Sequence, residues 1–544
     1  MPENARKPRS DSGRPVPPAT RYLRVFPYFR EGHAPAAEER KIAPPVSPAC
    51  PSPMSGFLSS AFLLILAACL CASELPAQVS VRVDWNHPDS QVKTTLTIQE
   101  CPEPPLMPGH SVHSAAMARL RELKADMARI QFWHPYPRLG VPELLPPSGG
   151  RTYWDFRLPD QALLDFYRAA EGRPVMLNFS TVPDWMLKTW APVTVSDNPD
   201  AIDWNYNQGR ALRDPSLKEL TEYYRRIAEW YIRGGFRDEA GTAHVSGHHL
   251  KFAYWEVLNE IDEEHMWSPE AYTRIYDAVV SAVKPVDPAM RFSALALANP
   301  AAHLDHFRYF LNPSNHRPGT PLDMVSYHFY IAANPGEDLD SLQELFYQRA
   351  GGVLDTVSQI EAIRKQLSPA TKTYINELGF MWMDGKKVDQ QPIPDRFWTL
   401  SSAVFAYTYL GLVRQGIDFV ASAELIDYPG QYAGSSLLDW TSGQPFARYY
   451  VTRELIRDVR AGDILCPTQV TGGAVAAQGF VSDRGRLIVL VNKLHTPQRV
   501  TIQGAKGMRA LAVTDTRSAP RSLRFSGASL ILAPDAVVFA SGPR

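Results

Sequence analysis

The sequence has few cysteines, no surplus of charge of either sign and no hydrophobic run long enough to span a membrane. Its 5 Cys include no CxxC pair, so no metal site is expected. Lys and Arg number 56 against 57 Asp and Glu, for a net charge of −1, so no basic surplus points to nucleic acid or an anionic membrane surface. A glycine-rich phosphate-binding motif is also missing. We therefore expect an uncharged partner and no cofactor.

The longest hydrophobic run covers residues 57–71 and resembles the apolar part of a secretory signal. At about 15 residues it is shorter than the ~20 residues that a membrane-spanning helix needs. Cleavage is expected after Ala77, which predicts a signal peptide over residues 54–77 and a secreted or periplasmic protein. The alternative is cleavage before Cys69, because Leu66-Ala67-Ala68-Cys69 resembles a bacterial lipoprotein signal and would leave a lipid anchor.

The segment ahead of this signal, residues 1–53, is rich in Pro, Arg, Ala and Ser and has no apolar periodicity. Such a segment cannot bury enough surface to offset its ordering entropy, so we expect it to be disordered. A signal normally begins close to a chain terminus, and Met54 immediately precedes this one. The hypothesis is that translation starts at Met54.

Cleavage after Ala77 would leave Cys101 and Cys466 as the remaining cysteines. Two lone buried thiols are the favoured interpretation, since a free cysteine behaves as a small apolar residue. A single disulfide in an oxidising compartment is the alternative.

From residue 79 onward, short β-branched or aromatic runs alternate with longer segments of helical periodicity, which indicates a parallel α/β domain. After an edge strand near 79–85, the expected strands are 95–101, 128–134, 174–180, 251–258, 290–297, 323–330, 371–377 and 417–424. The expected helices are 111–126, 158–171, 215–234, 269–286, 301–312, 341–367, 394–414 and 445–460. Eight βα units predict the fold class α/β, a (β/α)8 TIM barrel over residues 78–460.

Two helix starts carry supporting chemistry. Asp214-Pro215 and Ser268-Pro269 each place a capping side chain before a proline in the first helical turn, where the missing N–H costs nothing. The long connection 181–214 is expected to form a rim or lid of the site.

Beyond residue 460 the helical period gives way to short alternating runs such as Arg486–Val491 and Ala536–Phe539. These runs predict a small C-terminal antiparallel β-sandwich domain over residues 461–544. The edge strand near 79–85 is a candidate to complete it.

Two apolar strands end in glutamate: Trp255-Glu256-Val257-Leu258-Asn259-Glu260 and Thr373-Tyr374-Ile375-Asn376-Glu377. In the predicted barrel these are strands four and seven, so Glu260 and Glu377 would meet at the carboxyl ends, where barrel enzymes carry their chemistry. Two carboxyl groups about 5–5.5 Å apart can cleave a glycosidic bond with retention of configuration. Glu260 would be the general acid/base, and Glu377 would be the nucleophile. Asn259 would donate a hydrogen bond to the 2-hydroxyl of the sugar.

These motifs resemble those of the glycoside hydrolases of clan A, and within the clan those of family 39, which contains β-xylosidases and α-L-iduronidases. The clan's signature is an Asn-Glu pair on strand four and a Glu on strand seven, matched here by Asn259, Glu260 and Glu377. Further likenesses are Val182–Trp185, Ala243–Ser246, Glu256 and Leu322–His328. The resemblance covers about residues 79–540.

The resemblance implies that a His or Tyr at the end of strand six holds the nucleophile ionised, which makes His328 and Tyr330 the candidates. Tyr327 and Phe329 would point inward instead if the register slipped by one residue. Two departures from the family stand out. Ile261 replaces the proline that usually follows the acid, and strand eight shows no evident aromatic residue in Val420-Ala421-Ser422-Ala423-Glu424.

Other side chains near the strand ends have either a site role or a structural role as the expectation. Trp185 and Trp382 follow strands three and seven and are candidates to stack on sugar rings, with core packing as the alternative. Glu256 is expected to be structural, with Arg129 as a partner inside the barrel. The histidines at 244, 248 and 249 lie in a Gly-rich loop and are expected to be solvated rather than metal ligands.

Taken together, the sequence predicts a secreted retaining glycosidase, xylosidase- or iduronidase-like, acting on a carbohydrate substrate. Two alternatives remain open: a glycosidase of another clan A family, and a catalytically silent carbohydrate-binding barrel.

Overall fold

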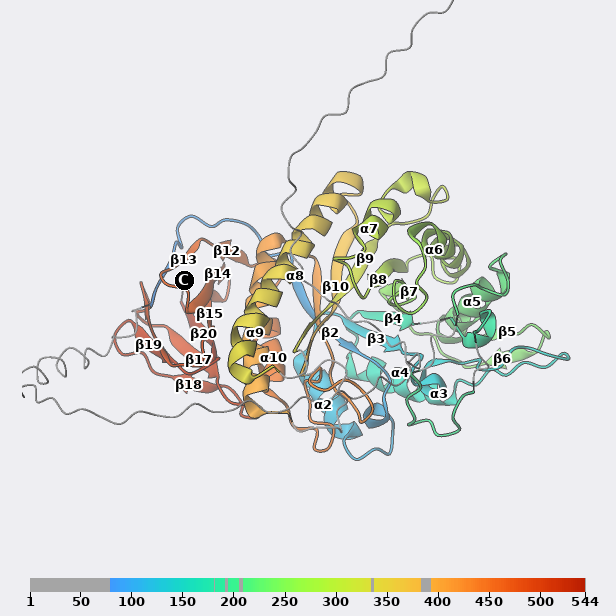
Figure 1. The fold of residues 1–544 in the computed structure, drawn as a ribbon, viewed down its shortest axis with the longest axis horizontal. Coiled ribbons are helices and arrows are strands. Elements are labelled where there is room, and N and C mark those ends of the chain that lie inside the picture. The colour runs from blue at the N-terminus through green and yellow to red at the C-terminus, as the bar shows by residue number, and fades with distance from the viewer. Residues whose placement is uncertain are drawn as a thin grey trace, which may run out of the picture. The chain divides into compact units, whose positions relative to one another are not determined.

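The computed structural model describes residues 79–543 except 181, 191–193, 205–208, 334–336 and 383–392. The predicted disordered segment 1–53, the start at Met54, the signal peptide 54–77 and the candidate anchor Cys69 lie outside the described residues. Figure 1 shows the chain coloured from its N-terminus to its C-terminus.

Eight strands form one closed barrel in the order β10-β11-β2-β3-β4-β7-β8-β9, in which every neighbouring pair is parallel. The strands are β2 (Thr95–Glu100), β3 (Ala128–Phe132), β4 (Val175–Phe179), β7 (Tyr254–Val257), β8 (Arg291–Leu297), β9 (Met324–Ala332), β10 (Lys372–Met381) and β11 (Phe419–Ser422). The predicted fold class is confirmed. All eight barrel strands lie within the segments that their β-branched and aromatic runs predicted, except that β9 and β10 extend beyond residues 330 and 377.

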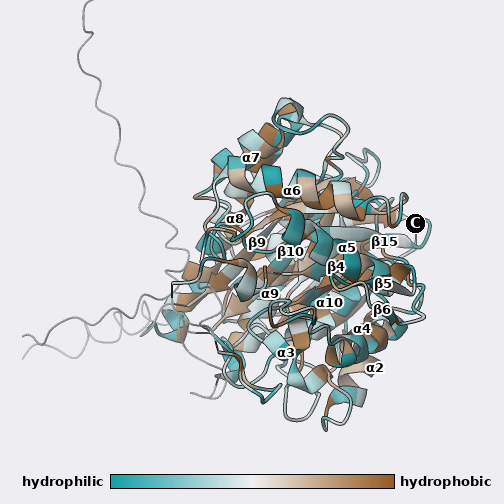
Figure 2. Cartoon of the chain, turned by 90° about the vertical axis from the view of Figure 1, so that its right-hand side faces the viewer, coloured by the Kyte–Doolittle hydropathy of each residue, from teal (hydrophilic) through white to brown (hydrophobic). Residues whose placement is uncertain are grey.

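Helices follow the barrel strands and cover their outer side. They are α2 (His113–Leu123), α3 (Pro137–Gly140), α4 (Arg157–Ala169), α5 (Lys218–Ile232), α6 (Pro269–Val283), α7 (Leu304–Phe310), α8 (Leu339–Leu367), α9 (Asp395–Gln415) and α10 (Ala447–Asp458). Figure 2 shows hydrophilic and hydrophobic residues on the same helices, as expected where one face packs on the strands and the other meets water.

The sequence prediction missed the short elements. These are α3, the 3-10 helices η1 (Pro104–Leu106), η2 (Asp184–Met186) and η3 (Pro313–Asn315), and a hairpin of β5 (Gly235–Arg237) with β6 (Ala243–Val245). Elements of three or four residues are too short to show a hydrophobic period, which explains their absence from the prediction.

One of the two predicted helix caps is present. Ser268 is the N-cap of α6, and its side chain accepts a hydrogen bond from the backbone N–H of Ala271. The cap predicted at Asp214 is wrong, because α5 begins at Lys218 and Leu217 takes its N-cap position in the left-handed conformation. Asp214 instead accepts from the backbone N–H groups of Ser216 and Glu219, so it closes the turn that precedes the helix.

The C-terminal part contributes nine strands, β12 to β20, to two further sheets, and these strands are drawn in red in Figure 1. One has the order β13-β1-β16-β19 and the other β12-β14-β15-β20-β17-β18. Their strands are β1 (Val79–Val83), β12 (Ile464–Cys466), β13 (Thr468–Val470), β14 (Val475–Ser482), β15 (Gly485–Asn492), β16 (Gln498–Ile502), β17 (Arg509–Val513), β18 (Arg521–Leu523), β19 (Ser529–Leu532) and β20 (Val537–Gly542). The pairs are antiparallel except β1 with β16, which is parallel.

These sheets pack on the barrel through specific polar contacts. Gln343 of α8 donates to the carbonyl of Lys493 and to the Asp535 carboxylate, each at 2.8 Å. Arg414 of α9 donates to the side-chain oxygen of Gln478 at 2.8 Å. Bonds between side chains and a facing sheet fix the orientation of the two layers.

Cys101 and Cys466 are both buried free thiols, which confirms the favoured interpretation and excludes the disulfide between them. In the described part of the chain, no helix is both long enough and apolar enough to cross a membrane.

Candidate active site

Glu260 and Glu377 lie at the carboxyl end of the barrel, directly after β7 and within β10. Leu258 and Glu260 both have positive φ, at 66° and 39°, so the chain turns sharply out of the barrel where β7 ends. In β10 the pairing with β9 shifts register between Ile375 and Glu377. Such a bulge breaks the strict alternation of a strand, so Asn376 and Glu377 both direct their side chains to buried polar groups of the barrel.

The two carboxyl groups converge on one histidine. The Nδ1 atom of His328 lies 2.9 Å from Oε1 of Glu260 and 3.3 Å from Oε2 of Glu377. One oxygen of each carboxyl group and a nitrogen of this ring all lie within 4.8 Å of one another. The separation therefore falls in the range of about 5 Å that allows direct attack on a carbon bound between two carboxyl groups.

Arg129, on β3, holds three of the polar groups at once. Its Nη1 donates to Glu377 at 2.8 Å, its Nη2 donates to Oδ1 of Asn259 at 2.8 Å, and its Nε donates to Glu256 at 2.6 Å. The guanidinium is fully buried, with 0% exposed. A planar fork of donors is the one side chain that can serve three acceptors in fixed directions.

Glu256 also accepts hydrogen bonds from Asn178, Ser326 and Asn376, at 2.7–2.9 Å. The fully buried carboxyl group of Glu256 therefore has hydrogen-bond donors on both of its oxygens, as a buried polar group requires. This agrees with the structural role predicted for Glu256, including its partner Arg129.

Tyr330 completes the surroundings of Glu377, since its hydroxyl donates to Oε2 at 2.7 Å. The register of β9 places His328 and Tyr330 toward the carboxyl groups. Tyr327 and Phe329 point outward, and Tyr327 packs edge-to-face on Phe307. The one-residue slip considered from the sequence does not occur.

The two carboxyl groups differ in their proton affinity. Burial raises the pKa of Glu260 above its usual value, and the neighbouring charge of Glu377 adds to the rise, while His328 opposes it. Burial also acts to raise the pKa of Glu377, but His328, Arg129 and the Tyr330 hydroxyl outweigh it, so the pKa is lowered. The pKa of His328 is raised, because the attraction of both carboxylates exceeds the cost of burying the cation. The environment thus favours a protonated Glu260 beside an ionised Glu377.

Asn259 is nearly fully buried, at 1% exposed. Its side-chain oxygen accepts from Arg129, which orients the amide so that its NH2 group faces Oε1 of Glu264 at 3.4 Å. The long distance of this second contact leaves the NH2 group available to another acceptor at the mouth of the barrel.

The two tryptophan candidates lie in different surroundings. Trp185 is half-buried on η2 and lines a cavity of about 960 Å3 with His134, Asp184 and Arg138. The Arg213 guanidinium lies 4.5 Å from the centre of its ring. The long connection that carries Trp185 thus forms one wall of this cavity, and its role as a rim or lid of the site stays a prediction.

Trp382 is only 8% exposed and packs edge-to-face on Phe397. Its surroundings are those of a core residue. Sugar stacking stays a prediction for both tryptophans.

Sequence reasoning missed a second group of carboxyl side chains, which is formed by Glu100, Glu103 and Glu424. One oxygen from each lies within 4.8 Å of the others. Burial, with the negative charge of Glu377 as the next cause, raises the pKa of Glu424 to about 8. The sequence offers one hint of this group. Glu424 stands at the end of strand eight, in the segment that lacks the aromatic residue usual in the clan.

The loop histidines have separate partners and do not gather. His244 contacts the Asp238 carboxylate at 2.8 Å, and His248 contacts Asp160 at 3.1 Å. His249 faces the carbonyl of Ile232 at 3.4 Å. The three histidines thus have three different hydrogen-bond partners.

No family model matches the sequence, and no curated protein matches it. Solved structures match the fold. A family 51 α-L-arabinofuranosidase from Bifidobacterium longum is 14% identical, with a TM-score of 0.59, over 85% of this chain and 99% of the other. A family GH39 β-xylosidase from Caulobacter crescentus is 13% identical, with a TM-score of 0.53, over 86% of this chain and 100% of the other. A family GH30 endoxylanase from Clostridium papyrosolvens is 14% identical, with a TM-score of 0.51, over 86% and 100%. At these identities the likeness shows a shared fold, a barrel with an attached β-sheet domain, in proteins that are named as glycoside hydrolases.

Proposed function

We propose that the protein is a retaining glycoside hydrolase in which Glu260 is the general acid/base and Glu377 is the nucleophile. The observation that carries the proposal is the meeting of these carboxyl groups at the carboxyl end of the barrel. Their nearest oxygens lie within 4.8 Å, and their pKa values are displaced in opposite directions. The fold shared with named glycoside hydrolases supports it.

In the first step, Glu377 attacks the anomeric carbon while Glu260 gives its proton to the departing oxygen. The bond between that carbon and the leaving oxygen breaks as a bond to the Glu377 carboxylate forms, and the leaving group departs as an alcohol. In the second step, Glu260 removes a proton from water, and the resulting hydroxide displaces Glu377. Glu260 is then protonated again, and the configuration at the anomeric carbon is retained.

The buried neighbours supply what this cycle requires. Arg129 and Tyr330 donate to Glu377 and keep it ionised, which favours nucleophilic attack. His328 contacts both Glu260 and Glu377. A change in the charge of one carboxyl group therefore changes the pKa of the other through this ring. Asn259, oriented by Arg129, would donate to the 2-hydroxyl as positive charge develops on the ring.

For the substrate, we propose an oligosaccharide or polysaccharide cleaved in a xylosidase- or iduronidase-like manner by a family 39 enzyme. The motifs around Asn259 and Leu322–His328 support this choice, and one of the matching structures is a β-xylosidase. The matching structures also include enzymes of families 51 and 30, so the competing proposal is that the protein is a glycosidase of another clan A family. We also propose export, because residues 57–71 resemble a signal.

The first test is Glu377→Ala, assayed on a panel of aryl glycosides. Turnover should fall by about 10³-fold or more, since an alanine offers no nucleophile. Added azide should restore cleavage and yield the glycosyl azide of inverted configuration. Glu344→Ala, which removes an exposed carboxylate of α8, is the matched control and should behave as wild type.

Unchanged turnover in Glu377→Ala would remove this residue from the mechanism. Binding of sugars by wild type with turnover by neither protein would instead identify a carbohydrate-binding barrel. A 2-deoxy-2-fluoro glycoside of the preferred sugar provides an independent check, because it should label a peptide that contains Glu377. A label on any other peptide would contradict the assignment.

A further inference from the structure

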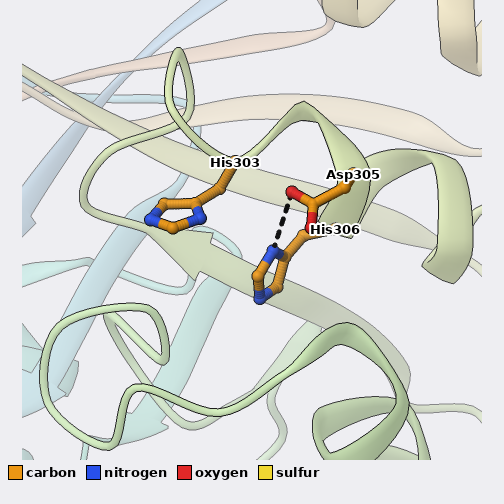
Figure 3. Close-up of side chains that lie close together, drawn as sticks. All are labelled: His303, Asp305 and His306. Carbon is orange, nitrogen blue, oxygen red and sulfur yellow. Dashed lines mark hydrogen bonds and ion pairs between the residues drawn. The ribbon is translucent and has the colours of Figure 1, made fainter.

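A second group of side chains with metal-binding chemistry lies in the loop between β8 and α7, and it consists of His303, Asp305 and His306. One ligand atom from each lies within 4.8 Å of the others. Figure 3 shows the three side chains close together at the start of α7, with a contact drawn between Asp305 and His306. None of them is among the hydrogen-bond partners of Glu260 or Glu377 described above, so this cluster is separate from the catalytic carboxyl groups.

The contacts of His306 fix which of its nitrogens carries a proton. Its Nε2 atom lies 3.0 Å from the carbonyl oxygen of Trp267. A carbonyl can only accept, so Nε2 donates, which leaves Nδ1 as the nitrogen that faces Asp305. Nδ1 lies 3.4 Å from Oδ1 of Asp305. A metal ion bound to both atoms would take the place of a proton shared between them.

This arrangement is the one that metal-binding histidines adopt. A ligating imidazole usually donates its other N–H to a backbone carbonyl or carboxylate, which fixes the ring and raises the basicity of the ligating nitrogen. Trp267 provides that carbonyl here, from the loop that follows β7 and carries Glu260. His306 itself is buried, with 5% of its side chain exposed, so its orientation is held by packing as well.

The rest of the cluster is open to solvent. Asp305 has 67% of its side chain exposed, and His303 is half-buried. Solvent can therefore deliver an ion and complete its coordination. Two imidazole nitrogens and one carboxylate oxygen suit Zn2+ and its first-row neighbours, whereas Ca2+ and Mg2+ prefer oxygen ligands only.

We propose that His303, Asp305 and His306 form a binding site for one divalent first-row transition-metal ion, with Zn2+ as the probe. The ion would join His303 and Asp305 to His306, whose ring is already bonded to Trp267. It would thereby tie the loop after β8 to the loop after β7. Two further bonds already connect these loops, from the backbone N–H groups of Ala298 and Asn299 to Asp262. The site is structural, and the inference does not depend on the proposed glycosidase activity.

The test is titration calorimetry of the whole, untagged protein with Zn2+ after removal of metals with a chelator. Wild type should bind one more equivalent of Zn2+ than His303→Ala and Asp305→Asn. Both changes are at partly or largely exposed side chains, and thermal melting without metal should show that the variants fold. His249→Ala, which removes another exposed loop histidine, is the matched control and should keep the wild-type stoichiometry.

A second readout uses Co2+, whose visible absorption reports nitrogen and oxygen ligands directly. The bands should appear with wild type and be absent with Asp305→Asn, and saturating Zn2+ should raise the melting temperature of wild type and of His249→Ala but not of His303→Ala or Asp305→Asn. Equal stoichiometry in wild type and His303→Ala would overturn the proposal. So would a Zn2+ equivalent that disappears only in His328→Ala, since it would place the ion between Glu260 and Glu377.

Discussion

Arg129 forms ion pairs with two buried carboxyl groups of the barrel, those of Glu256 and Glu377. Replacing Arg129 therefore tests how much these buried ion pairs stabilise the fold. Arg129→Leu would leave Glu256 and Glu377 buried without their cation. Removing one partner of a buried ion pair costs about 3–5 kcal/mol, and the unfolding free energy should fall by about that amount. Urea unfolding measures it.

Two comparisons separate this effect from a general loss of charge. Arg129→Lys keeps a cation but not the fork of donors, so it should recover only part of the stability. Arg121→Leu removes an exposed arginine that lies 3.6 Å from Glu171, and its cost should stay below about 1 kcal/mol. An equal loss at both arginines would show that the buried contacts contribute nothing specific.

The opposite displacements of the two pKa values predict a bell-shaped dependence of kcat/KM on pH. Activity requires ionised Glu377 and protonated Glu260, so the acid limb lies below the usual carboxyl pKa and the alkaline limb above it. Glu260→Gln should abolish the alkaline limb when the substrate is an aryl glycoside that needs no acid.

Tyr330→Phe tests the acid limb of the same profile. It removes the 2.7 Å hydrogen bond to Glu377, so the pKa of Glu377 rises and the acid limb moves to higher pH. A hydrogen bond to a charged group is worth about 1.5–3 kcal/mol, which predicts a loss of about 10- to 100-fold in kcat/KM. An acid limb that does not move would mean that Tyr330 does not act through Glu377.

Among the helices, α6 begins directly after its N-cap residue, Ser268. Ser268→Ala removes the side-chain acceptor for the N–H of Ala271 and should lower the unfolding free energy by about 1 kcal/mol. Ser268→Asp keeps an acceptor and should restore most of it. Because Pro269 occupies the first turn in both variants, the difference between them isolates the capping bond. Equal stability of the two would contradict the capping role.

Element boundaries show where sequence patterns stop being informative. The strand around Glu377 was expected to end at that residue, whereas β10 continues to Met381. Its bulge, next to Glu377, cannot be read from alternation because it is itself a break in alternation. The false cap at Asp214 has a similar origin, since an Asp before Pro also suits an isolated turn.

For the whole molecule, buried carboxyl groups predict how stability depends on pH. Burial is the main cause that raises the pKa to about 8 for Glu143 and Glu424. In the unfolded chain these groups ionise near their usual pKa of about 4.3, so at neutral pH the folded state binds more protons than the unfolded state. The two groups stabilise the folded state fully at pH values below their pKa in the unfolded chain. This stabilisation is lost as pH rises through their folded-state pKa of about 8.

The double variant Glu143→Gln/Glu424→Gln, which keeps both groups neutral, should therefore lose less unfolding free energy than wild type between pH 7 and pH 9. Urea unfolding at both pH values measures this loss. Glu344→Gln, at an exposed position, should follow wild type. Parallel pH dependence in all three proteins would show that the two buried carboxyl groups do not titrate in this range.

The sequence by itself determined the eight strands, the eight long helices, the barrel and the pair Glu260 and Glu377, because hydrophobic period and position at a strand end are local properties of the chain. It also indicated the pairing of Arg129 with Glu256 through alternation along the strands. Only the tertiary structure decided that Arg129 reaches Glu377 and Asn259 as well, that Glu424 joins Glu100 and Glu103, and that His306 faces Trp267. Those contacts join strands and loops far apart in sequence, so they depend on the closure of the barrel, which sets distances that no local pattern encodes.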